Sequence, residues 1–477
     1  LATMLAVRFW VLPRINEWRP TIEQHLSDAL SAKVRIGSLA ASWSGLSPTL
    51  TIENLTVSNE QDAVLLHVPD AFATVSWSSV LDWDLRLHHL EMSGIDVSIS
   101  RDEQGAFTVA GFKIDSQPDT AFKLDSDTPV VKWLLNQGKV IVHDATVRWL
   151  DQFRAAPEFI LTDVDLALSN GLFTHGFLFS AELPEQVGKR VELIVKTNHL
   201  LHQISAHTKR EAEIYLEAQD LEPALLAPWV DLPAIDGRFA ARAWVDVVNG
   251  QLGQTVLEVA GNHLGIALPV SDAPVAIIAK RADLQLTALL ADLLPKLQSD
   301  YLLPSQEDQR LKAKVSFKDL TLKSALFDPS ALEVGNLSTT LELRKKASAI
   351  AALDLTGLSI DNPHLQMSLA GTWASLEADP LGQVDLKGTI SQLSASHLHQ
   401  YLTPVTDDET RHWLRDALTK GQFNQVTLAL KGELSQFPFT QPGEQGVFEL
   451  KGQFKGLSVD YAPPQAKELS WPPLSEA

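Results

Sequence analysis

The chain has 477 residues, of which 45% are hydrophobic and 21% charged, a composition typical of an ordered protein with a substantial core. Its formal net charge of −20 argues against a nucleic-acid groove, because such a groove needs clustered Lys and Arg. The chain has no cysteine, which excludes disulfides, thiolate zinc sites and cysteine nucleophiles. We therefore expect no nucleic-acid partner.

The first segment, residues 1–12, reads LATMLAVRFWVL and is apolar except for Thr3 and Arg8. A helix of this length rises about 18 Å, which is too short for a hydrocarbon core that needs about 20 residues. We interpret it as the distal part of a truncated transmembrane anchor, and a buried or signal-derived apolar helix is the alternative. Trp10 and Trp18 belong to a residue type found where a spanning helix meets the headgroups.

The next segment, residues 13–33, is predicted to be an amphipathic helix. Ile15, Trp18, Ile22 and Leu26 recur at helical spacing, and Pro20 predicts a kink. From residue 34 onward the chain consists mostly of short strands and turns.

Several of these strands share a pattern of eight residues with apolar side chains at positions one, three, six and eight. A half-buried strand alternates with a period of two, so the third apolar residue arrives one position late. The residue before it is of a type that tolerates positive φ. This predicts a β-bulge, which bends the strand and returns later side chains to the original face. The residues in this position of the six strong copies are Asn54, His89, Asp144, Asp163, Asp319 and Gly357.

Six strong copies favour a structural repeat over coincidental bulges. We assign their large apolar residues to one concave face. From the residues alone, this face could be an open groove or a closed core covered by a second sheet or by helices. The assigned residues are Leu50, Ile52, Leu55, Val57, Leu85, Leu87, Leu90, Met92, Val140, Val142, Val147, Phe159, Leu161, Val164, Leu166, Val315, Phe317, Leu320, Leu322, Leu353, Leu355, Leu358 and Ile360.

The predicted fold class is mainly β: an elongated, strongly curved antiparallel sheet with a few short helices. We divide the strand-rich part into three modules, 34–127, 128–302 and 303–477, and both ends of the chain look truncated. Helical periodicity or capping signals predict helices over 128–138, 284–297, 396–402 and 406–420.

Recognisable catalytic chemistry is missing from the sequence. No stretch matches a phosphate-binding loop, a dinucleotide fingerprint, a GxSxG elbow or an HExxH motif. His397 and His399 would share one side of a strand, but no third ligand lies near them in the sequence. We therefore predict no metal, no cofactor and no enzymatic activity.

One long stretch resembles a known family. The segment TPVVKWLLNQGKVIVHDATVRWLDQFRAAPEFILTDVDLALSNGLFTHGF (128–177) is similar to the middle of the YhdP family of AsmA-like bacterial proteins. RINEWRPTIEQHLSDALSAK and its sequel resemble that family's opening, and YLTPVTDDETRHWLRDALTKGQF with the later FPF resembles its next module. The motif positions are occupied by Trp133, Gln137, Trp149, Asp151, Pro157 and His175.

This resemblance implies a protein of Gram-negative bacteria that is anchored in the inner membrane and lies mostly in the periplasm. It implies a β-groove that carries phospholipid toward the outer membrane as a bridge-like lipid-transfer protein, supporting lipid homeostasis and barrier integrity. The implied partners are phospholipids, the inner membrane and envelope proteins.

Two other functions remain possible on the sequence. The chain could be a structural or assembly factor for outer-membrane biogenesis, with its apolar face packed shut and a large protein interface. It could also be a hydrolase whose residues converge from separate modules, which would require a pocket with perturbed carboxylates or histidines.

Overall fold

The computed structural model describes residues 8–9, 12–30, 32–45, 47–59, 62, 64–77, 86–114, 137–171, 174–198, 211–231, 235–248, 251–268, 274–289, 308–325, 327, 329–346, 349–376, 381–402, 408–437, 439 and 445–460. The chain divides into two compact units. The first comprises Leu1–Leu232 and Arg242–Gln251, and the second comprises Pro233–Ala241 and Leu252–Ala477. Strand β13 (Ile235–Val248) contributes residues to both.

The first unit begins with a 3-10 helix, η2 (Leu12–Trp18), and an α-helix, α2 (Arg19–Leu30), followed by strands. A second 3-10 turn, η3 (Pro223–Leu226), follows the last of them. The strands are β1 (Lys33–Ser44), β2 (Ser47–Ser58), β3 (Val64–Val75), β4 (Leu87–Ser93), β5 (Asp96–Arg101), β6 (Phe107–Val109), β7 (Phe112–Ile114), β8 (Lys139–Asp151), β9 (Phe159–Asn170), β10 (His175–Glu182), β11 (Arg190–Thr197) and β12 (Glu211–Leu221).

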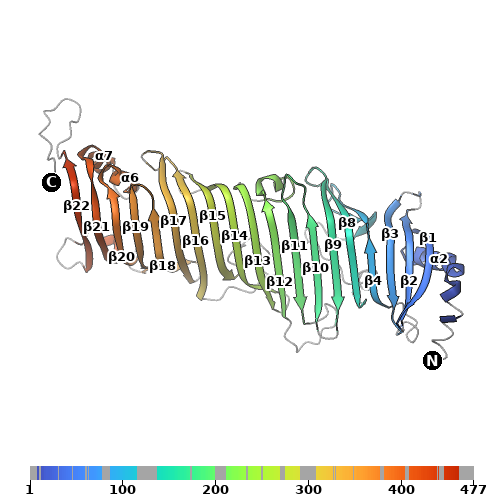
Figure 1. Ribbon diagram of the computed structural model, residues 1–477. Coiled ribbons are helices and arrows are strands. Elements are labelled where there is room, and N and C mark those ends of the chain that lie inside the picture. The colour runs from blue at the N-terminus through green and yellow to red at the C-terminus, as the bar shows by residue number, and fades with distance from the viewer. Residues whose placement is uncertain are drawn as a thin grey trace. The chain divides into compact units, whose positions relative to one another are not determined.

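Most strands of this unit pair with their sequence neighbours in antiparallel fashion, from β1 to β4 and again from β8 to β12 (Figure 1). The exception is β8, which pairs in parallel with β4 over its first part and with β5 over its second. Strands β5, β6 and β7 form a short antiparallel meander beside this junction.

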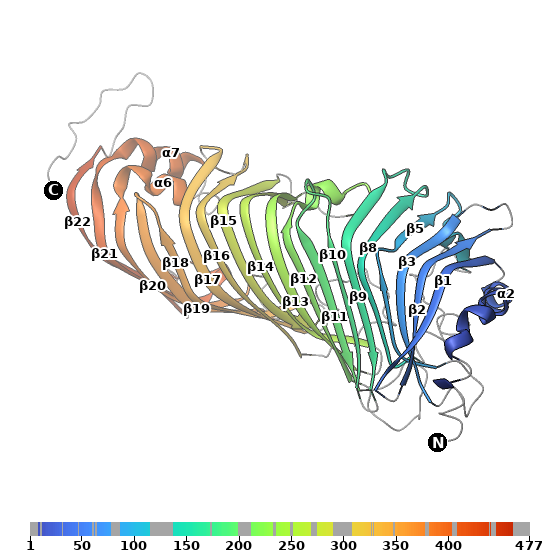
Figure 2. The same ribbon diagram turned by 45° about the vertical axis from the view of Figure 1, so that its right-hand side comes forward.

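The second unit is an antiparallel series in which each strand pairs with the next, from β14 to β22. Its strands bend along their length (Figure 2). The elements are β14 (Gln251–Leu268), β15 (Val275–Leu289), β16 (Asp308–Lys323), β17 (Ala331–Lys346), β18 (Ala349–Asp361), β19 (Leu365–Ala374), β20 (Gln383–Ser394), η5 (Ala395–His397), α6 (Leu398–Tyr401), α7 (Asp408–Ala417), β21 (Leu418–Glu433), η6 (Leu434–Gln436) and β22 (Gly446–Val459).

The predicted fold class is confirmed: the protein is mainly β, its strands are mostly antiparallel, and its helices are few and short. The amphipathic helix predicted over 13–33 is present as η2 and α2, and the change of helix type falls between Trp18 and Arg19, next to Pro20. Among the described residues, no helix is long and apolar enough to cross a membrane.

Two helix predictions need correction. The segment predicted as a helix over 284–297 is strand β15 as far as Leu289, because Leu284 and Leu286 pair with Val315 and Ala313 of β16 and so alternate as strand residues. Residues 290–297 lie outside the described part. The helix predicted over 406–420 ends at Ala417, where β21 begins. The short helix over 396–402 is present as η5 and α6, and residues 128–136 are not described.

Candidate functional site

The first unit carries an uninterrupted row of apolar side chains across nine strands. Directly paired residues in a sheet point to the same face, so the strand register shows which side chains lie in a row. Eight strand spacings of about 4.8 Å give this row a length of about 38 Å. Its members, from β1 to β12, are Leu39, Ile52, Ala71, Met92, Val142, Leu166, Phe179, Leu193 and Leu216.

The neighbouring row, one residue along each strand, points to the opposite face and is entirely polar. The contact between β8 and β9 in this row is a hydrogen bond of 3.3 Å between His143 Nδ1 and Asp165 Oδ1. This face is mixed rather than wholly polar, because the next row on it includes Phe72, Ile141, Leu178 and Ile194. The polar row consists of Ser38, Glu53, Asp70, Ser93, His143, Asp165, Ser180, Glu192 and Glu217.

The second unit has a similar arrangement. Its apolar row spans nine strands and includes one glycine, on β19, and its neighbouring row is polar from β15 to β21, between Val256 of β14 and Val447 of β22. The apolar row is Leu257, Leu286, Ala313, Leu341, Leu355, Gly371, Leu386, Leu430 and Phe448. The polar row is Thr287, Lys312, Glu342, Asp354, Thr372, Asp385 and Lys431.

The predicted left-handed backbone is present at five of the six strong copies, and a register shift, as in a β-bulge, accompanies it at Asp144, Asp163, Asp319 and Gly357 but not at Asn54. Residues 54, 144, 163, 319 and 357 have φ values of 55°, 53°, 48°, 52° and 63°. His89 does not have a positive φ, and the irregularity in β4 lies between His89 and Leu87 instead, at His88. Two further strands have a left-handed residue, with φ of 53° at Asp220 and 61° at Gly456.

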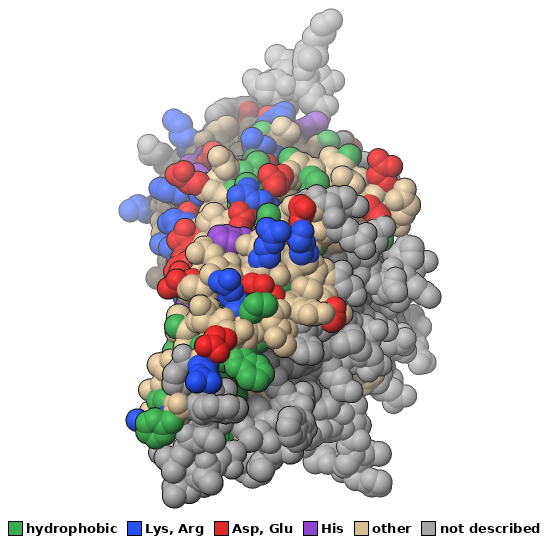
Figure 3. Space-filling view, turned by 90° about the vertical axis from the view of Figure 1, so that its right-hand side faces the viewer, with side chains coloured by type: hydrophobic (Ala, Val, Ile, Leu, Met, Phe, Trp, Pro, Cys, Tyr) green, Lys and Arg blue, Asp and Glu red, His purple; other side chains and the backbone are tan. Residues whose placement is uncertain are grey.

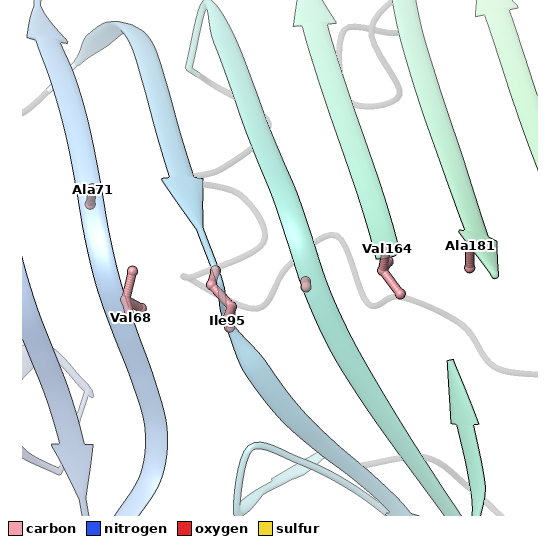
Figure 4. Close-up of a cluster of buried hydrophobic side chains, with 6 residues drawn as sticks. Val68, Ala71, Ile95, Val164 and Ala181 are labelled. Atoms are coloured by element: carbon pink, nitrogen blue, oxygen red, sulfur yellow. The ribbon is translucent and has the colours of Figure 1, made fainter. Parts of the chain in front are cut away.

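The residue after several left-handed positions is buried. Ala145 follows Asp144 and is 4% exposed, and Leu320 follows Asp319 and is 3% exposed. Figure 4 shows a cluster of buried side chains in the first unit that includes Ile95 and Val164 and is spread over neighbouring strands. The bend thus creates a narrow buried line along each sheet. Other residues of this kind are Ile95, Val164, Leu264, Val426 and Leu457.

The copy at 50–57 keeps its apolar residues on one face across the left-handed Asn54. Its four apolar residues pair with apolar residues on both neighbouring strands, before and after Asn54. On β1 the partners of Leu50, Ile52, Leu55 and Val57 are Ala41, Leu39, Ile36 and Val34. On β3 they are Ala73, Ala71, Val68 and Leu66.

The structure gathers the other assigned residues into clusters on the same face. Leu50, Leu87, Leu90, Met92 and Val140 share one cluster. A second contains Ile52, Leu55, Met92, Val142, Val147, Leu161 and Val164, and a third, in the second unit, contains Phe317, Leu320, Leu322 and Ile360. The remaining members are placed by register: Phe159 opposite Trp149, Val315 opposite Leu284, and Leu353, Leu355 and Leu358 opposite Leu343, Leu341 and Leu369. Leu85 lies outside the described residues.

Sequence reasoning missed much of the apolar face. Phe179, Leu193, Leu386 and Leu430 lie in the apolar rows, but their strands lack a strong copy of the eight-residue pattern. The only signal for these residues in the sequence was the alternation of apolar and polar side chains along each strand. The register with a neighbouring strand then decides which residues of a strand lie on the apolar face.

Large side chains on the apolar face are only partly covered. Leu216, in the apolar row of β12, is 46% exposed. On β22, Phe448 is 47% and Leu450 is 59% exposed. These three large side chains of the apolar rows and of β22 are therefore partly open to solvent.

Side chains on the polar face contact one another through short polar contacts and hydrogen bonds. His143 lies 3.9 Å from Glu91, and Arg190 lies 3.7 Å from Asp163 and donates a hydrogen bond of 2.7 Å to Ser180 Oγ. These side chains are partly solvated, so each pair adds little stability. Acidic and basic side chains also lie interspersed on the surface in Figure 3.

The motif residues shared with the family are structural. Gln137 is 1% exposed, and its Oε1 accepts a hydrogen bond of 2.7 Å from the N–H of Leu87, where β4 begins. Its carbonyl accepts one from Asn170, whose Oδ1 lies 3.2 Å from His175 Nδ1. At the other end of β8, the Asp151 carboxylate accepts the N–H of Arg154.

Two aromatic contacts lie near this end of β8. Trp149 stacks on Phe107 with 5.9 Å between the ring centroids. The Pro157 carbonyl accepts a hydrogen bond from Trp229, whose ring lies 4.8 Å from Phe159. Trp133 is not among the described residues. The motif residues that are described therefore hold the strands around the parallel junction.

A hollow of about 500 Å³ lies at one end of strands β9–β12. Its charged lining residues are Lys196, Glu211 and Glu213, and its uncharged polar ones include Ser169, Thr174, His175, Thr197 and Asn198. Within the described part of the chain, no three His, Cys, Asp or Glu side chains converge to hold a metal ion. His397 and His399 lie in η5 and α6, not on a strand as expected.

Comparison with protein families gives one match. The model described as YhdP protein matches residues 1–289 and 291–477, which is nearly the whole chain. No curated protein and no solved structure matches.

Proposed function

The chain belongs to the YhdP family, and we propose that it conducts phospholipids along the apolar faces of its two sheet units. The family is one of bacterial envelope proteins associated with lipid transport rather than catalysis. The observation that carries the proposal is the pair of nine-strand apolar rows, each beside a polar row.

The physical argument concerns the acyl tails of the phospholipid. Exposing a methylene to water costs about 0.8 kcal/mol, so two long acyl tails cost on the order of 20 kcal/mol. A transport path must keep these tails against apolar surface at every step. A row that passes from strand to strand without a polar interruption offers such a surface.

Partial exposure of the apolar face favours a ligand over a closed core. A packed core buries its large side chains, whereas Leu216 remains 46% exposed within the apolar row. We further propose that the chain works in the periplasm, is held by an N-terminal inner-membrane anchor, and passes phospholipid between the inner and outer membranes. Partner proteins would supply any energy, because the sequence contains no nucleotide-binding motif.

Site-specific photo-crosslinking in living cells tests this proposal. A photoreactive residue replaces Leu216 in the first unit or Leu358 in the second. The controls replace Glu213 and Ser368, which lie on the polar faces, opposite Lys196 and opposite Ser359 and Thr389. Leu320 is a poor probe position because it is 3% exposed.

We expect covalently attached phospholipid at Leu216 and Leu358 and none at the two controls. Folded proteins without lipid at any of the four positions would contradict the proposal. The apolar faces would then be covered by protein, and an assembly factor with a closed core would be the better description.

A further inference from the structure

We propose that the polar face of the first unit carries a docking site for a basic, amphipathic helix of a partner protein. The site is a row of apolar side chains beside the polar row, and we call it the docking stripe. It lies on the face opposite the apolar row, so docking does not require lipid conduction. The docking stripe consists of Phe72, Ile141, Ala167, Leu178, Ile194 and Tyr215, with Trp244 beside Tyr215.

The docking stripe is continuous in strand register. Its members lie opposite one another on neighbouring strands, from β3 through β4 and β8 to β12, which lie side by side in Figure 1. On β4 the position is occupied by Glu91, which lies opposite Phe72 and Ile141. Six strand spacings of about 4.8 Å give the stripe a length of about 29 Å. Trp244 of β13 extends it, because the Trp244 ring lies 5.4 Å from that of Tyr215.

The docking stripe is most open to solvent at its two ends. Phe72 is 37% exposed and Trp244 is 40% exposed, whereas Ile141, Leu178 and Ile194 between them are partly buried. These side chains point away from the buried clusters, because each is one residue away from a member of the apolar row on the same strand. Exposed aromatic side chains of this kind are enriched where proteins bind partners.

Acidic side chains line one border of the docking stripe. This border is the polar row, which lies two residues away along each strand and contains no Lys or Arg. Two of its carboxylates have a cation nearby, because Asp165 lies 3.9 Å from Arg190 and Glu217 lies 3.3 Å from Arg242. No described Lys or Arg lies within 4.0 Å of the other three. The five acidic residues are Glu53, Asp70, Asp165, Glu192 and Glu217.

The other border of the docking stripe is not acidic. Two residues away in the opposite direction, the same strands carry Thr74, His89, Lys139, Lys196 and Glu213. Charge complementarity therefore calls for a partner with Lys or Arg along one side of its own apolar stripe. Such an arrangement would fix the orientation of the partner and favour its association.

A helix suits this surface better than an added strand or a membrane. Strands β3, β4 and β8–β11 already bond a neighbour on each edge, so a partner must bind through side chains. A helix rises about 5.4 Å per turn, close to the strand spacing of about 4.8 Å, so apolar side chains one turn apart meet successive strands. About 20 residues would span the stripe. The acidic border would repel anionic lipids.

A designed peptide tests the chemistry of the site. The probe is a helix of about 20 residues with a Leu stripe bordered by Lys on one side. Fluorescence anisotropy measures its binding to the whole chain. We expect Phe72→Ser with Ile194→Ser to weaken binding about tenfold or more, whereas Leu216→Ser in the apolar row should leave binding unchanged. A larger loss from the Leu216 variant than from the double variant would overturn the inference.

Exchange of charge separates docking from a folding defect. The variant Glu53→Lys/Asp70→Lys/Glu192→Lys changes only side chains that are at least partly exposed. It should bind the Lys peptide more weakly and gain affinity for a matched peptide that has Glu in place of Lys. Equal binding of the two peptides to the wild type, or an unchanged preference in the triple variant, would contradict the proposed complementarity.

Crosslinking in living cells identifies the natural occupant. A photoreactive residue replaces Phe72 or Trp244, and Ser368 on the polar face of the second unit is the control. We expect protein adducts at Phe72 and Trp244, attached to a segment with Lys or Arg beside an apolar stripe. Phospholipid adducts, an acidic segment or no protein adduct would refute the docking site. The lipid crosslink at Leu216 reports on the opposite face, so the two proposals fail separately.

Discussion

Glu23 Oε1 accepts a hydrogen bond of 2.8 Å from the backbone N–H of Ile36, so a helix side chain occupies the place of a neighbouring strand beside β1. One turn later Ser27 Oγ accepts the N–H of Val34, and one turn earlier Arg19 donates to the carbonyl of Gly37. Spacing of four residues puts all three side chains on one side of α2. The helix thereby covers the edge of the sheet, where exposed N–H and C=O groups would otherwise recruit another strand.

Removing these contacts should make the chain self-associate. We expect Glu23→Ala with Ser27→Ala to form dimers through paired β1 edges, measured by analytical ultracentrifugation over a range of concentrations. Each lost hydrogen bond should also lower the free energy of unfolding by roughly 1 kcal/mol. Gln24→Ala with Asp28→Ala, on the exposed side of α2, is the matched control. A strictly monomeric double variant would refute the role of α2 as an edge cover.

The left-handed residue in β16 gives a second prediction. Asp319 has a φ of 52°, a conformation that a β-branched residue adopts only with strain of about 1–2 kcal/mol. Asp319→Val should lower the unfolding midpoint, whereas Asp319→Gly should not. Denaturant titration measures both, with Lys318→Val as a control on the preceding, exposed position. Equal midpoints for the two Asp319 variants would show that this backbone conformation is unimportant for stability.

The buried Gln137 side chain gives a third prediction. Gln137→Leu preserves the volume approximately but leaves the N–H of Leu87 without its 2.7 Å acceptor. Leaving a buried donor unsatisfied costs about 1–3 kcal/mol, so amide hydrogen exchange at Leu87 should accelerate. Mass spectrometry or NMR can follow it. Lys139→Ala, an exposed change in the adjacent strand, should leave the exchange unchanged. Protection at Leu87 that survives the Gln137 substitution would contradict this account.

Glu217 on the polar face gives a prediction about pH. The hydrogen bond of 2.6 Å from the Tyr215 hydroxyl is the largest of the causes that lower the pKa of Glu217, ahead of Gln219 and Arg242. Tyr215→Phe should therefore raise this pKa toward its ordinary value of 4.5, as read by NMR titration of the carboxyl carbon. Gln219→Ala should produce a smaller change. An unaltered titration of Glu217 in the Phe variant would be inconsistent with the contact.

The lowered pKa of Glu217 determines whether its contribution to stability rises or falls with pH. The ionised Glu217 stabilises the folded state above pH 4.5, and this contribution fades as the pH falls below that value. The stability difference between wild type and Tyr215→Phe should accordingly shrink in acid.

Local signals in the sequence were sufficient to predict most of the left-handed positions, although the prediction at His89 was wrong. Asn54, Asp144, Asp163, Asp319 and Gly357 were predicted from one late apolar residue and a permissive residue before it, and all have positive φ. These features depend on a few neighbouring residues, so a single strand contains the information.

Features that depend on distant partners could not be predicted. Leu284 and Leu286 fit a helix as well as a strand, and pairing with β16 decided the outcome. The hydrogen bonds from α2 to β1 and the stack of His364 on His397 join side chains whose proximity depends on the tertiary fold. The apolar rows likewise depend on register, which the sequence of one strand does not fix.

A single left-handed residue marks the bend in several strands, so the shape of these strands depends on other positions than their surface chemistry does. A side chain on the apolar face can change among Leu, Ile, Val, Phe or Met without altering the curvature, provided that the left-handed residue is retained. Sequences of this kind can therefore diverge widely along their faces while their strands keep the same bend. The most informative positions for comparing them are Asn54, Asp144, Asp163, Asp319 and Gly357, not the larger apolar residues around them.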